Sequence, residues 1–562
     1  MVTGLLFSQL GYELGETATV IIRAPKIDFL TSKSKCQLIP LNGQSPHSAS
    51  CIYWGEIWNS NWWIIDFNDI KEEGEWDIQV VDSDNIKLSA KQLRVKRNVL
   101  WDSTYEYAAV DMLERRKHFT DLGAGWQDAG TLWVESPAHS GSIICLADLS
   151  KHNNSRINNS FLKRIYEQIT VGADYLVMTQ QKAQENGHPK GAMCHDLLKQ
   201  EKYVLSNDIL KAVVALFKAA AVLPKRYTEK IESYKNAANT GFAYLLTHAK
   251  PNGDTGYNRK QRGLPSNTDI PKHEWLTRDL VFFCWAALES YKSGNIKHKA
   301  RCIDYADQII KRQITIENSE KGYYGHFREF DSLPHSENLW IHGVDGIFGA
   351  DVGGVFPNYL IPFFEMIELW HDHEKVTLWR SSLQHYAEGF LIPTCSKNPF
   401  NLVPLGIFGD EGPIWFAGPF HGTNVTYGYT AAIAIKLSVL LNNPKLKIIA
   451  TSNLQWIAGL NAGITKESLS ASVVHSEDID KNTAIPTSMI CDIGNKHSGS
   501  WFKTRGVICN GFSTGSQFLM DTDPTKENDG PFAFTDEDWI PHSAAWITGL
   551  MALNDINNVE DV

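Results

Sequence analysis

The stretch GAGWQDAGTLW, residues 123–133, lies near the start of a long helical region, just after a region rich in predicted strands. Its glycines indicate a loop. That loop holds a single acid, Asp128, between Trp126 and Trp133. Because loops on a rigid scaffold often carry catalytic groups, Asp128 is a candidate catalytic carboxylate.

The first part of the chain, residues 1–97, predicts a β-sandwich. It contains β-rich or alternating runs that are separated by turn signals such as PLNGQS and KEEGE. The runs are ATVIIRAP, KCQLIPL, NWWIIDF, EWDIQVV and KQLRVKR. Several short strands in such a short region are typical of two packed sheets.

The rest of the chain, residues 98–562, predicts helices. The segment 161–180, for example, places Phe161, Ile165 and Ile169 on one stripe with helical spacing. The other predicted helices are an opening one at 103–118 and those at 208–223, 230–249, 278–292, 299–314, 358–370, 379–391, 425–441, 447–460 and 541–553.

These helices come in pairs, joined alternately by short turns and by long loops rich in Gly, Pro, Asp and Trp. Such a run favours an α-solenoid or a closed toroid, and the lack of a fixed period disfavours the solenoid. The predicted fold class is therefore mostly α, with an (α/α)6 barrel at 98–562 and a β-sandwich at 1–97. We expect the long loops to gather at one end of the barrel and build a cleft.

Charge and composition exclude several kinds of partner. The net charge is −11 and no basic patch stands out, so nucleic acid is not expected. No run reaches 18 apolar residues, so no membrane span is expected. There is no Gly-rich phosphate loop, and no organic cofactor is implied. Oligomeric state is not indicated.

The nine cysteines are scattered and form no CxxC motif, which argues against a zinc ribbon or a thioredoxin-type site. Several lie in apolar runs such as VFFCWAAL, so buried free thiols are expected, as in a reducing compartment. The N-terminus also lacks the features of a signal peptide, which favours a cytoplasmic protein. A secreted protein whose signal is missing from the sequence would look the same.

A second acidic segment is FTDEDWIPHSAAW, residues 534–546. It places Asp536, Glu537 and Asp538 in a row before an apolar helix, where acids are also favoured by the helix dipole alone. Inverting hydrolysis of a glycosidic bond needs a protonated and an ionised carboxyl group about 6.5–9.5 Å apart. Repulsion among three acids raises at least one pKa, so Glu537 suits the role of the acid.

Several ordered segments resemble glycoside hydrolase family 9, the inverting cellulase and endoglucanase family, in its subgroup with an N-terminal immunoglobulin-like domain. LLFSQLGY resembles the opening strand of that domain, and GWQDAGTLW resembles the family motif G-W-x-D-A-G-D. RIYEQITVGADYLVMTQ, LQWIAGLNAG and TDEDWIPHSAAWITGLMAL resemble later landmarks. The resemblance implies a carbohydrate-degrading hydrolase.

The resemblance also implies roles for single residues. Glu537 matches the proton donor, and Asp128 matches the first Asp of D-A-G-D, which helps to hold the attacking water. The second Asp, the family's principal base, is replaced here by Thr131. The His-His-Arg substrate motif is also altered, because KHSGSWFKTRG separates His497 from Arg505.

Four interpretations of this site follow. Asp128 itself acts as the base, with Thr131 also contacting the water. Another carboxylate replaces the missing one, either Glu135 or one from IFGDEGPIWF, Asp410 or Glu411. The enzyme handles a different saccharide, such as an amino-sugar or acidic glycan. The site has lost hydrolysis and only binds sugar.

Other residues are candidates for contacts with an oligo- or polysaccharide on fewer sequence features. Trp126 and Trp133 are predicted to form a stacking platform, and Trp415, His421 and Tyr427 to lie on a cleft rim. A polysaccharide lyase is an alternative function, with Tyr427 or His421 as the base and Arg505 nearby. No metal ligands are assigned, although the oxygen-rich segment 520–530 suits a structural calcium ion.

Overall fold

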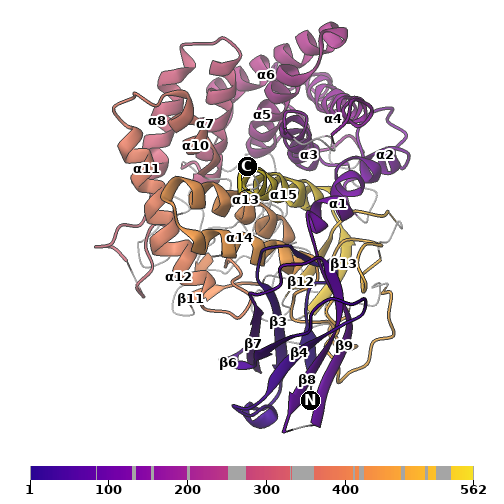
Figure 1. Cartoon of the computed structure of the whole chain (residues 1–562). Helices are drawn as coiled ribbons and strands as arrows, with labels where there is room; N and C mark the ends of the chain where they lie inside the picture. The colour runs from indigo at the N-terminus through magenta and orange to yellow at the C-terminus, as the bar shows by residue number, and fades with distance from the viewer. Residues whose placement is uncertain are drawn as a thin grey trace.

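The computed structural model describes residues 2–83, 85–129, 134–153, 157–198, 201, 203–250, 274–319, 321–328, 331, 360–404, 406–408, 412–416, 423–469, 475–499, 504–513 and 533–560. The strands of the N-terminal part gather at one end of the molecule and the helices fill the other end (Figure 1). The change from strands to helices falls between Lys96, where β9 ends, and Val99, where α1 begins.

The N-terminal part is built from two sheets with strand orders β1-β3-β7-β6 and β2-β9-β8-β4-β5. In β8, alternate side chains such as Trp76 and Ile78 are buried between the sheets, as the pleat of a strand requires. The predicted sandwich is therefore present. Its strands are β1 (Gly4–Leu6), β2 (Tyr12–Glu13), β3 (Ala18–Ala24), β4 (Lys35–Pro40), β5 (His47–Ser50), β6 (Ile52–Ile57), β7 (Ser60–Phe67), β8 (Gly74–Asp82) and β9 (Asn85–Lys96).

The sandwich is tied to the helical part by hydrogen bonds from backbone and side chains. The Gln9 N–H donates to the Ala458 carbonyl at 2.9 Å, and Gln455 Nε2 donates to the Gly11 carbonyl at 3.0 Å. On the same seam, Trp58 packs edge-on against Trp415, with ring centroids 5.7 Å apart. The sandwich therefore packs against one end of the helical part, below the helices in Figure 1.

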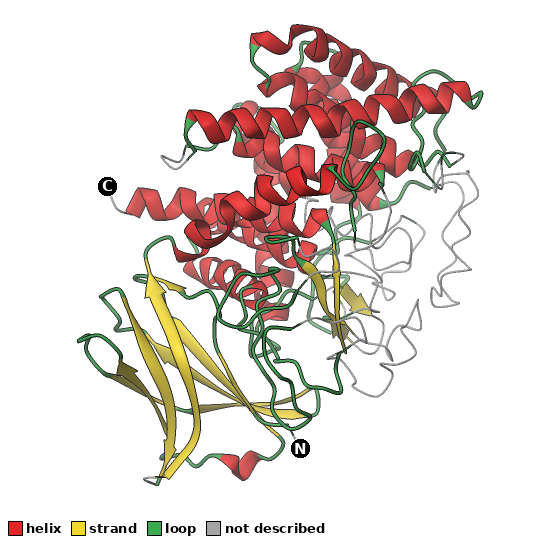
Figure 2. Ribbon diagram, turned by 90° about the vertical axis from the view of Figure 1, so that its right-hand side faces the viewer, coloured by secondary structure: helices red, strands yellow, loops and turns green. Residues whose placement is uncertain are grey.

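The helical part is a ring of paired helices. Contacts run from α3 to α5, from α5 to α7 and on through α10 and α11 to α13, and α13 contacts α15. The last helix, α15, also packs against α3, so the series returns to its start. Figure 1 shows α13 and α15 side by side in the middle of the view, and Figure 2 shows the helices gathered above the strands of the two sheets.

The helices are α1 (Val99–Glu106), α2 (Met112–Lys117), α3 (Ser136–Leu149), α4 (Asn159–Glu185), α5 (Ser206–Val222), α6 (Thr228–Thr247), α7 (Thr277–Lys292), α8 (His298–Lys311), α10 (Ile361–Leu369), α11 (Val376–His385), α12 (Ile392–Cys395), α13 (Asn424–Leu441), α14 (Pro444–Ile457) and α15 (Ile540–Glu560). Two π-helical turns continue helices, η2 (Tyr107–Asp111) and η6 (Tyr386–Leu391). Short ribbons are formed by β10 (Gly406–Phe408) with β11 (Gly412–Ile414) and by β12 (Cys509–Ser513) with β13 (Ala533–Asp538).

The sequence pattern does not predict α3. Most of its residues are buried on every side, and the helix contains Pro137, Gly141 and three serines. A helix that is enclosed all round has no polar face, so it shows no helical period in its sequence. α13 is apolar for the same reason. It is long and apolar enough to cross a membrane, but 72% of it is buried inside the protein, as in a central core helix.

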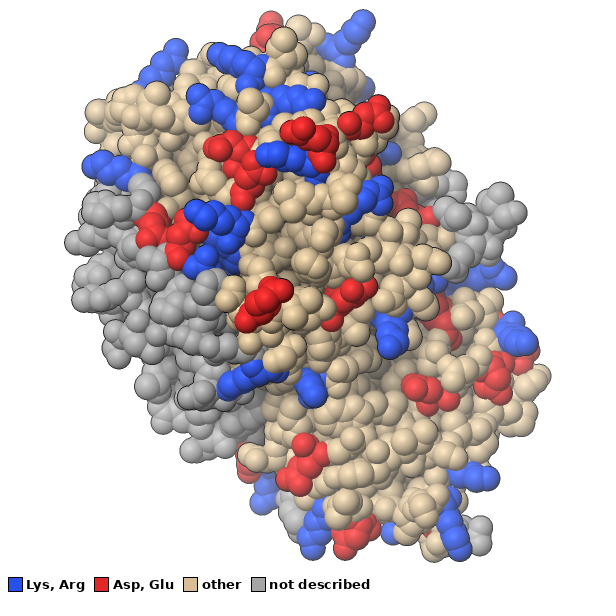
Figure 3. Space-filling view, turned by 90° about the vertical axis from the view of Figure 1, so that its left-hand side faces the viewer, with Lys and Arg blue, Asp and Glu red and all other residues tan. Residues whose placement is uncertain are grey.

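All nine cysteines are buried and none forms a disulfide, in agreement with the free thiols expected from the sequence. Two of them, Cys284 on α7 and Cys302 on α8, bring their sulfur atoms to 3.6 Å from each other. On the surface drawn in Figure 3, acidic and basic side chains are mixed among neutral ones, so the described part of this face carries no field of one sign.

The contact between α13 and α15 gives a first prediction. A Cβ atom added at Gly428 would lie 2.5 Å from the backbone carbon of Ala545, so Gly428→Ala forces the two helices apart. We expect a loss of about 1–3 kcal/mol in the free energy of unfolding, measured by urea denaturation. Gly141→Ala is the control, because a Cβ there meets nothing within 4 Å, and it should be neutral or stabilising. Equal effects of the two changes would contradict this account.

Candidate functional site

The two predicted acids come from distant parts of the chain, and backbone contacts bring those parts together. Ala129 forms an antiparallel bridge with Trp539, and the Ile540 N–H donates to the Asp128 carbonyl at 2.9 Å. The loop after α2 is thus paired with the end of β13 and the start of α15. The segments that carry Asp128 and Glu537 therefore lie side by side, and the roles of the two acids stay a prediction.

A buried ion pair fixes this junction. The Arg116 guanidinium, on α2, pairs with the Asp538 carboxylate, and both side chains are fully buried. Arg116 Nη1 also donates to the backbone carbonyls of Gln127 and Ala129, each at 3.3 Å. One side chain therefore holds the helix, the Asp128 loop and β13 in register.

Glu537 lies beside this pair, where β13 has a bulge. Cys509 pairs with Asp538 and Gly511 with Thr535, so Asp536 and Glu537 together face the single residue Asn510 of β12. Asn510 Nδ2 donates to Glu537 Oε2 at 3.0 Å. Glu537 is half-buried, whereas Asp538 is buried completely. The bulge thus leaves Glu537 accessible and oriented by an amide, a common use of bulges near functional sites.

Asp128 lies deeper in the protein. It is 0% exposed, its Oδ2 accepts the Glu135 N–H at 3.0 Å, and its Oδ1 has no hydrogen-bond partner among the described residues. Burial raises the pKa of the Asp128 carboxyl well above its usual range, and the nearby Glu135 carboxylate raises that pKa further.

Glu135 itself is the N-cap residue of α3 and faces a histidine. Glu135 Oε1 lies 3.4 Å from His195 Nε2, and His195 Nδ1 lies 2.7 Å from Asp208 Oδ2. Burial acts to lower the pKa of His195, but the carboxylates of Asp208 and Glu135 outweigh it and raise this pKa well above its usual value. His195 is thus buried between two carboxyl groups, an arrangement that the sequence did not reveal.

Trp126 lies beneath the site and not on a cleft wall. Its indole is fully buried, stacks on His139 with ring centroids 5.1 Å apart, and donates from Nε1 to Gln168 Oε1 at 3.0 Å. Burial lowers the pKa of His139 to about 4, so this ring is neutral. The His139 Nε2 accepts the backbone N–H of Trp126, and the His139 Nδ1 contacts the Glu135 carbonyl at 2.7 Å. Trp126 therefore supports the site and presents no face to a sugar.

Trp415 and Tyr427, predicted on a cleft rim, are buried as well. Tyr427 is fully buried and its hydroxyl donates to the Trp415 carbonyl at 3.2 Å. Trp415 Nε1 donates to the Leu402 carbonyl at 2.9 Å, and its ring belongs to the seam with the β-sandwich. The rim prediction is wrong for these two side chains because the helices and the sandwich enclose them.

His497 and Arg505 lie on the surface near β12. His497 Nδ1 is 3.9 Å from Asp492 Oδ1, and the exposed Arg505 guanidinium stacks over the ring of Tyr107 at 4.1 Å. Within the described part of the chain, their partners do not include Asp128 or Glu537. Their role as substrate-binding residues stays a prediction.

Several predicted residues lie outside the described residues. They are Thr131, Trp133, His421, Asp410, Glu411 and the segment 520–530. Within the ranges that the structure describes, no group of three or more His, Cys, Asp or Glu side chains is arranged to hold a metal ion.

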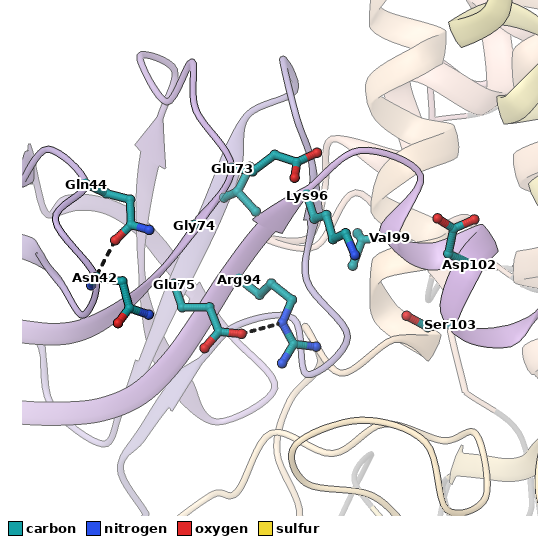
Figure 4. A pocket seen from close by; sticks show the side chains of 11 residues that line it. Asn42, Gln44, Glu73, Gly74, Glu75, Arg94, Lys96, Val99, Asp102 and Ser103 are labelled. Atoms are coloured by element: carbon teal, nitrogen blue, oxygen red, sulfur yellow. Dashed lines mark hydrogen bonds and ion pairs between the residues drawn. The ribbon is translucent and has the colours of Figure 1, made fainter.

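A polar hollow of about 460 Å³ lies elsewhere, between the β-sandwich and α1 (Figure 4). Its charged side chains are partly paired with each other, since Arg94 Nε lies 2.9 Å from Glu75 Oε1. None of its lining residues belongs to the predicted site. The hollow is therefore separate from the pair of segments that carry Asp128 and Glu537.

Comparison with known proteins supports the fold. No protein-family profile matches the sequence, and no curated protein matches it significantly. Among solved structures, a family 9 glycoside hydrolase (GH9) of Bacteroides ovatus is 13% identical with a TM-score of 0.63, covering 98% of this chain and 99% of its own. A metagenome-derived family 9 endoglucanase is 13% identical with a TM-score of 0.61, covering 98% of each chain.

A third structure is AaCel9A in complex with cellobiose-like isofagomine. It is 14% identical with a TM-score of 0.58, and the match covers 98% of this chain and all of the other. At these identities, structural similarity establishes the fold and leaves the activity open. The chain thus has the fold of glycoside hydrolase family 9, with its N-terminal β domain, as the resemblance in the sequence predicted.

The Arg116–Asp538 pair gives a second prediction. Arg116→Met leaves a buried carboxylate unpaired, so we expect a loss of about 3–5 kcal/mol in the free energy of unfolding in urea. The double variant Arg116→Met with Asp538→Leu should recover part of this loss. The control is Lys163→Met, which removes an exposed partner 3.7 Å from Glu167 and should cost less than about 0.5 kcal/mol. Similar losses for Arg116→Met and the control would show that the buried pair is unimportant.

Proposed function

We propose that this protein is a glycoside hydrolase that cleaves a β-linked poly- or oligosaccharide with inversion at the anomeric carbon. The ring of paired helices is then a closed (α/α)6 barrel, and the N-terminal sandwich an immunoglobulin-like domain that braces it. The fold shared with family 9 structures supports the proposal. The observation that carries it is the backbone pairing that brings the accessible Glu537 beside the Asp128 loop.

In this proposal Glu537 is the general acid. Its carboxyl group protonates the leaving glycosidic oxygen. A carboxylate in or next to the Asp128 loop holds and activates the water that attacks from the opposite face. The Asn510 amide keeps the Glu537 carboxyl in one orientation. Arg116 holds the two sides of the site at a fixed separation, which inversion requires.

The substrate differs from cellulose in this proposal. Thr131 stands where the family motif has its principal base, and a hydroxyl group is a poor base near neutral pH. An amino-sugar or acidic glycan is therefore a candidate substrate. AaCel9A was solved with a cellobiose-like compound, which supports a β-linked sugar as the ligand class for this fold.

Two alternatives differ in what they need from the site. A polysaccharide lyase would use Tyr427 or His421 as its base. The Tyr427 hydroxyl is buried and donates to a backbone carbonyl, and His421 lies outside the described residues. A carbohydrate-binding protein without activity would keep the same fold. Incubation with neutral, amino and acidic oligosaccharides distinguishes the three. A hydrolase releases reducing ends, a lyase adds ultraviolet absorbance from an unsaturated uronide, and a binding protein only raises its melting temperature.

The third prediction tests the acid. Glu537→Gln keeps the shape of the side chain and removes the transferable proton, so we expect release of reducing ends to fall by about 10²–10⁴-fold with little change in ligand affinity. Turnover is measured on the best substrate of the panel, and affinity by calorimetry. Glu467→Gln, at an exposed glutamate, is the control and should keep full activity. Near-normal turnover of Glu537→Gln would exclude Glu537 as the acid.

The fourth prediction concerns the departure from the family motif. Thr131→Asp restores the second Asp of D-A-G-D. A gain of activity on β-1,4-glucan would indicate that the chain has only lost the family base. We expect no gain, because in our proposal the site is built for another saccharide. The assay compares β-1,4-glucan with the best substrate of the panel.

A further inference from the structure

Glu135 is placed next to the proposed catalytic loop by contacts that do not involve its own carboxylate. Its N–H donates to Asp128 Oδ2 at 3.0 Å, and the neighbouring Ser136 N–H donates to the His195 carbonyl at 2.8 Å. The Tyr175 hydroxyl donates to the Val134 carbonyl and accepts the Leu197 N–H at 3.2 Å. The start of α3 is therefore fixed between the Asp128 loop and the segment that carries His195.

The two carboxyl groups at this point differ in access. Asp128 is 0% exposed, whereas the Glu135 side chain is 21% exposed. A base must reach the water that it deprotonates, and a group without exposed surface is poorly placed to do so. Of the two, Glu135 is the one that solvent reaches.

The two groups also differ in charge environment. The Glu135 carboxyl lies 3.4 Å from His195 Nε2 and occupies the N-cap position of α3, at the positive end of the helix dipole. Asp128 is surrounded by protein and has the Glu135 carboxylate as a neighbour, and burial first and then that carboxylate raise the pKa of Asp128. The two adjacent carboxyl groups therefore lie in different environments, and His195 adjoins Glu135.

His195 is itself held in place. Its Nδ1 contacts Asp208 Oδ2 at 2.7 Å, and Asp208 is buried on α5. The His195 N–H donates to the Tyr203 carbonyl at 2.8 Å. These two contacts fix the orientation of the His195 ring toward Glu135. Asp208 thus orients His195 as a carboxylate orients a catalytic histidine.

We propose that Glu135, and not Asp128, is the base of this site, and that Asp208 and His195 are positioning residues that hold the Glu135 carboxyl group where solvent reaches it. This inference rests on the proposed glycoside hydrolase function. In this proposal the catalytic base, whose usual position in the D-A-G-D motif is occupied by Thr131, is a residue outside that motif.

The step balances as follows. The water oxygen forms a bond to the anomeric carbon while the Glu135 carboxylate takes one proton of that water. The bond from the anomeric carbon to the glycosidic oxygen breaks, its electron pair stays on that oxygen, and Glu537 supplies the proton. Glu135 ends protonated and Glu537 ionised, and exchange of one proton with solvent restores both.

The main experiment uses the intact chain with the best substrate of the panel. We expect Glu135→Gln to lower kcat by about 10²–10⁴-fold. In Glu135→Ala, sodium azide should enter the space of the lost carboxylate, restore sugar cleavage at least about tenfold, and yield a glycosyl azide of inverted configuration. Asp128→Ala with azide should yield no such product, and circular dichroism checks that each variant is folded.

The outcomes are distinguishable. If Glu135→Gln keeps its kcat within about threefold, or if azide restores Asp128→Ala and leaves Glu135→Ala inactive, the base is not Glu135. Absence of azide rescue in both folded alanine variants also overturns the proposal. If the wild-type protein cleaves no oligosaccharide, the proposed function fails and this inference fails with it. If only Glu537→Gln behaves as expected, the hydrolase proposal stands and Glu135 alone is excluded.

A second measurement tests the positioning role. The titratable and charged groups around Glu135 are Asp128, Tyr175, His139 and His195, with Arg116, Asp196 and Asp208 behind them. His195→Gln removes the imidazole ring that lies 3.4 Å from the Glu135 carboxyl, and we expect the acid limb of kcat/KM to move up by about one pH unit. The control is His152→Gln, which removes a histidine paired with Asp555 at 3.3 Å far from the site. An unmoved acid limb in His195→Gln would exclude this role.

Discussion

The ion pair between Arg116 and Asp538 is the constraint on which the site depends. The two residues are 422 positions apart, and both side chains are removed from water, so each charge needs the other. By also binding the carbonyls of Gln127 and Ala129, Arg116 fixes the register in which the Asp128 loop meets β13. The accessible Glu537 and the buried Asp128 then follow from this register, one on each side of the junction.

Around this junction the carboxyl groups have different environments. Glu537 is half-buried and held by an amide, Asp128 is enclosed with one oxygen unpartnered in the described part of the chain, and Glu135 faces a histidine that Asp208 keeps charged. The three carboxyl groups thus lie in three different environments around one junction. Different environments are the physical means by which carboxyl groups on one fold come to serve different purposes.

Much of the fold could be predicted from sequence because amphipathic helices such as α4 and alternating strands such as β8 show their period directly. α3 was missed because an enclosed helix has no polar face. Motifs nominate Asp128 and Glu537 as candidates, but they also place Trp126 on a cleft, because a sequence does not tell a buried indole from an exposed one. His195, Arg116 and Asn510 gave no signal, since their partners are distant in sequence and only the fold brings them together.

The order in which the ring is assembled has a consequence for biogenesis. α15 contacts α13 and also α3, which precedes it by hundreds of residues, and the strand that carries Glu537 leads directly into α15. A nascent chain that has emerged only as far as α14 therefore has an open ring with unmatched apolar helix faces, and such faces are prone to aggregation. Closure is a late, non-local event with a large entropic barrier. It completes the architecture and brings β13, with Glu537, against the Asp128 loop, so a chain arrested before α15 has neither the closed ring nor this pairing.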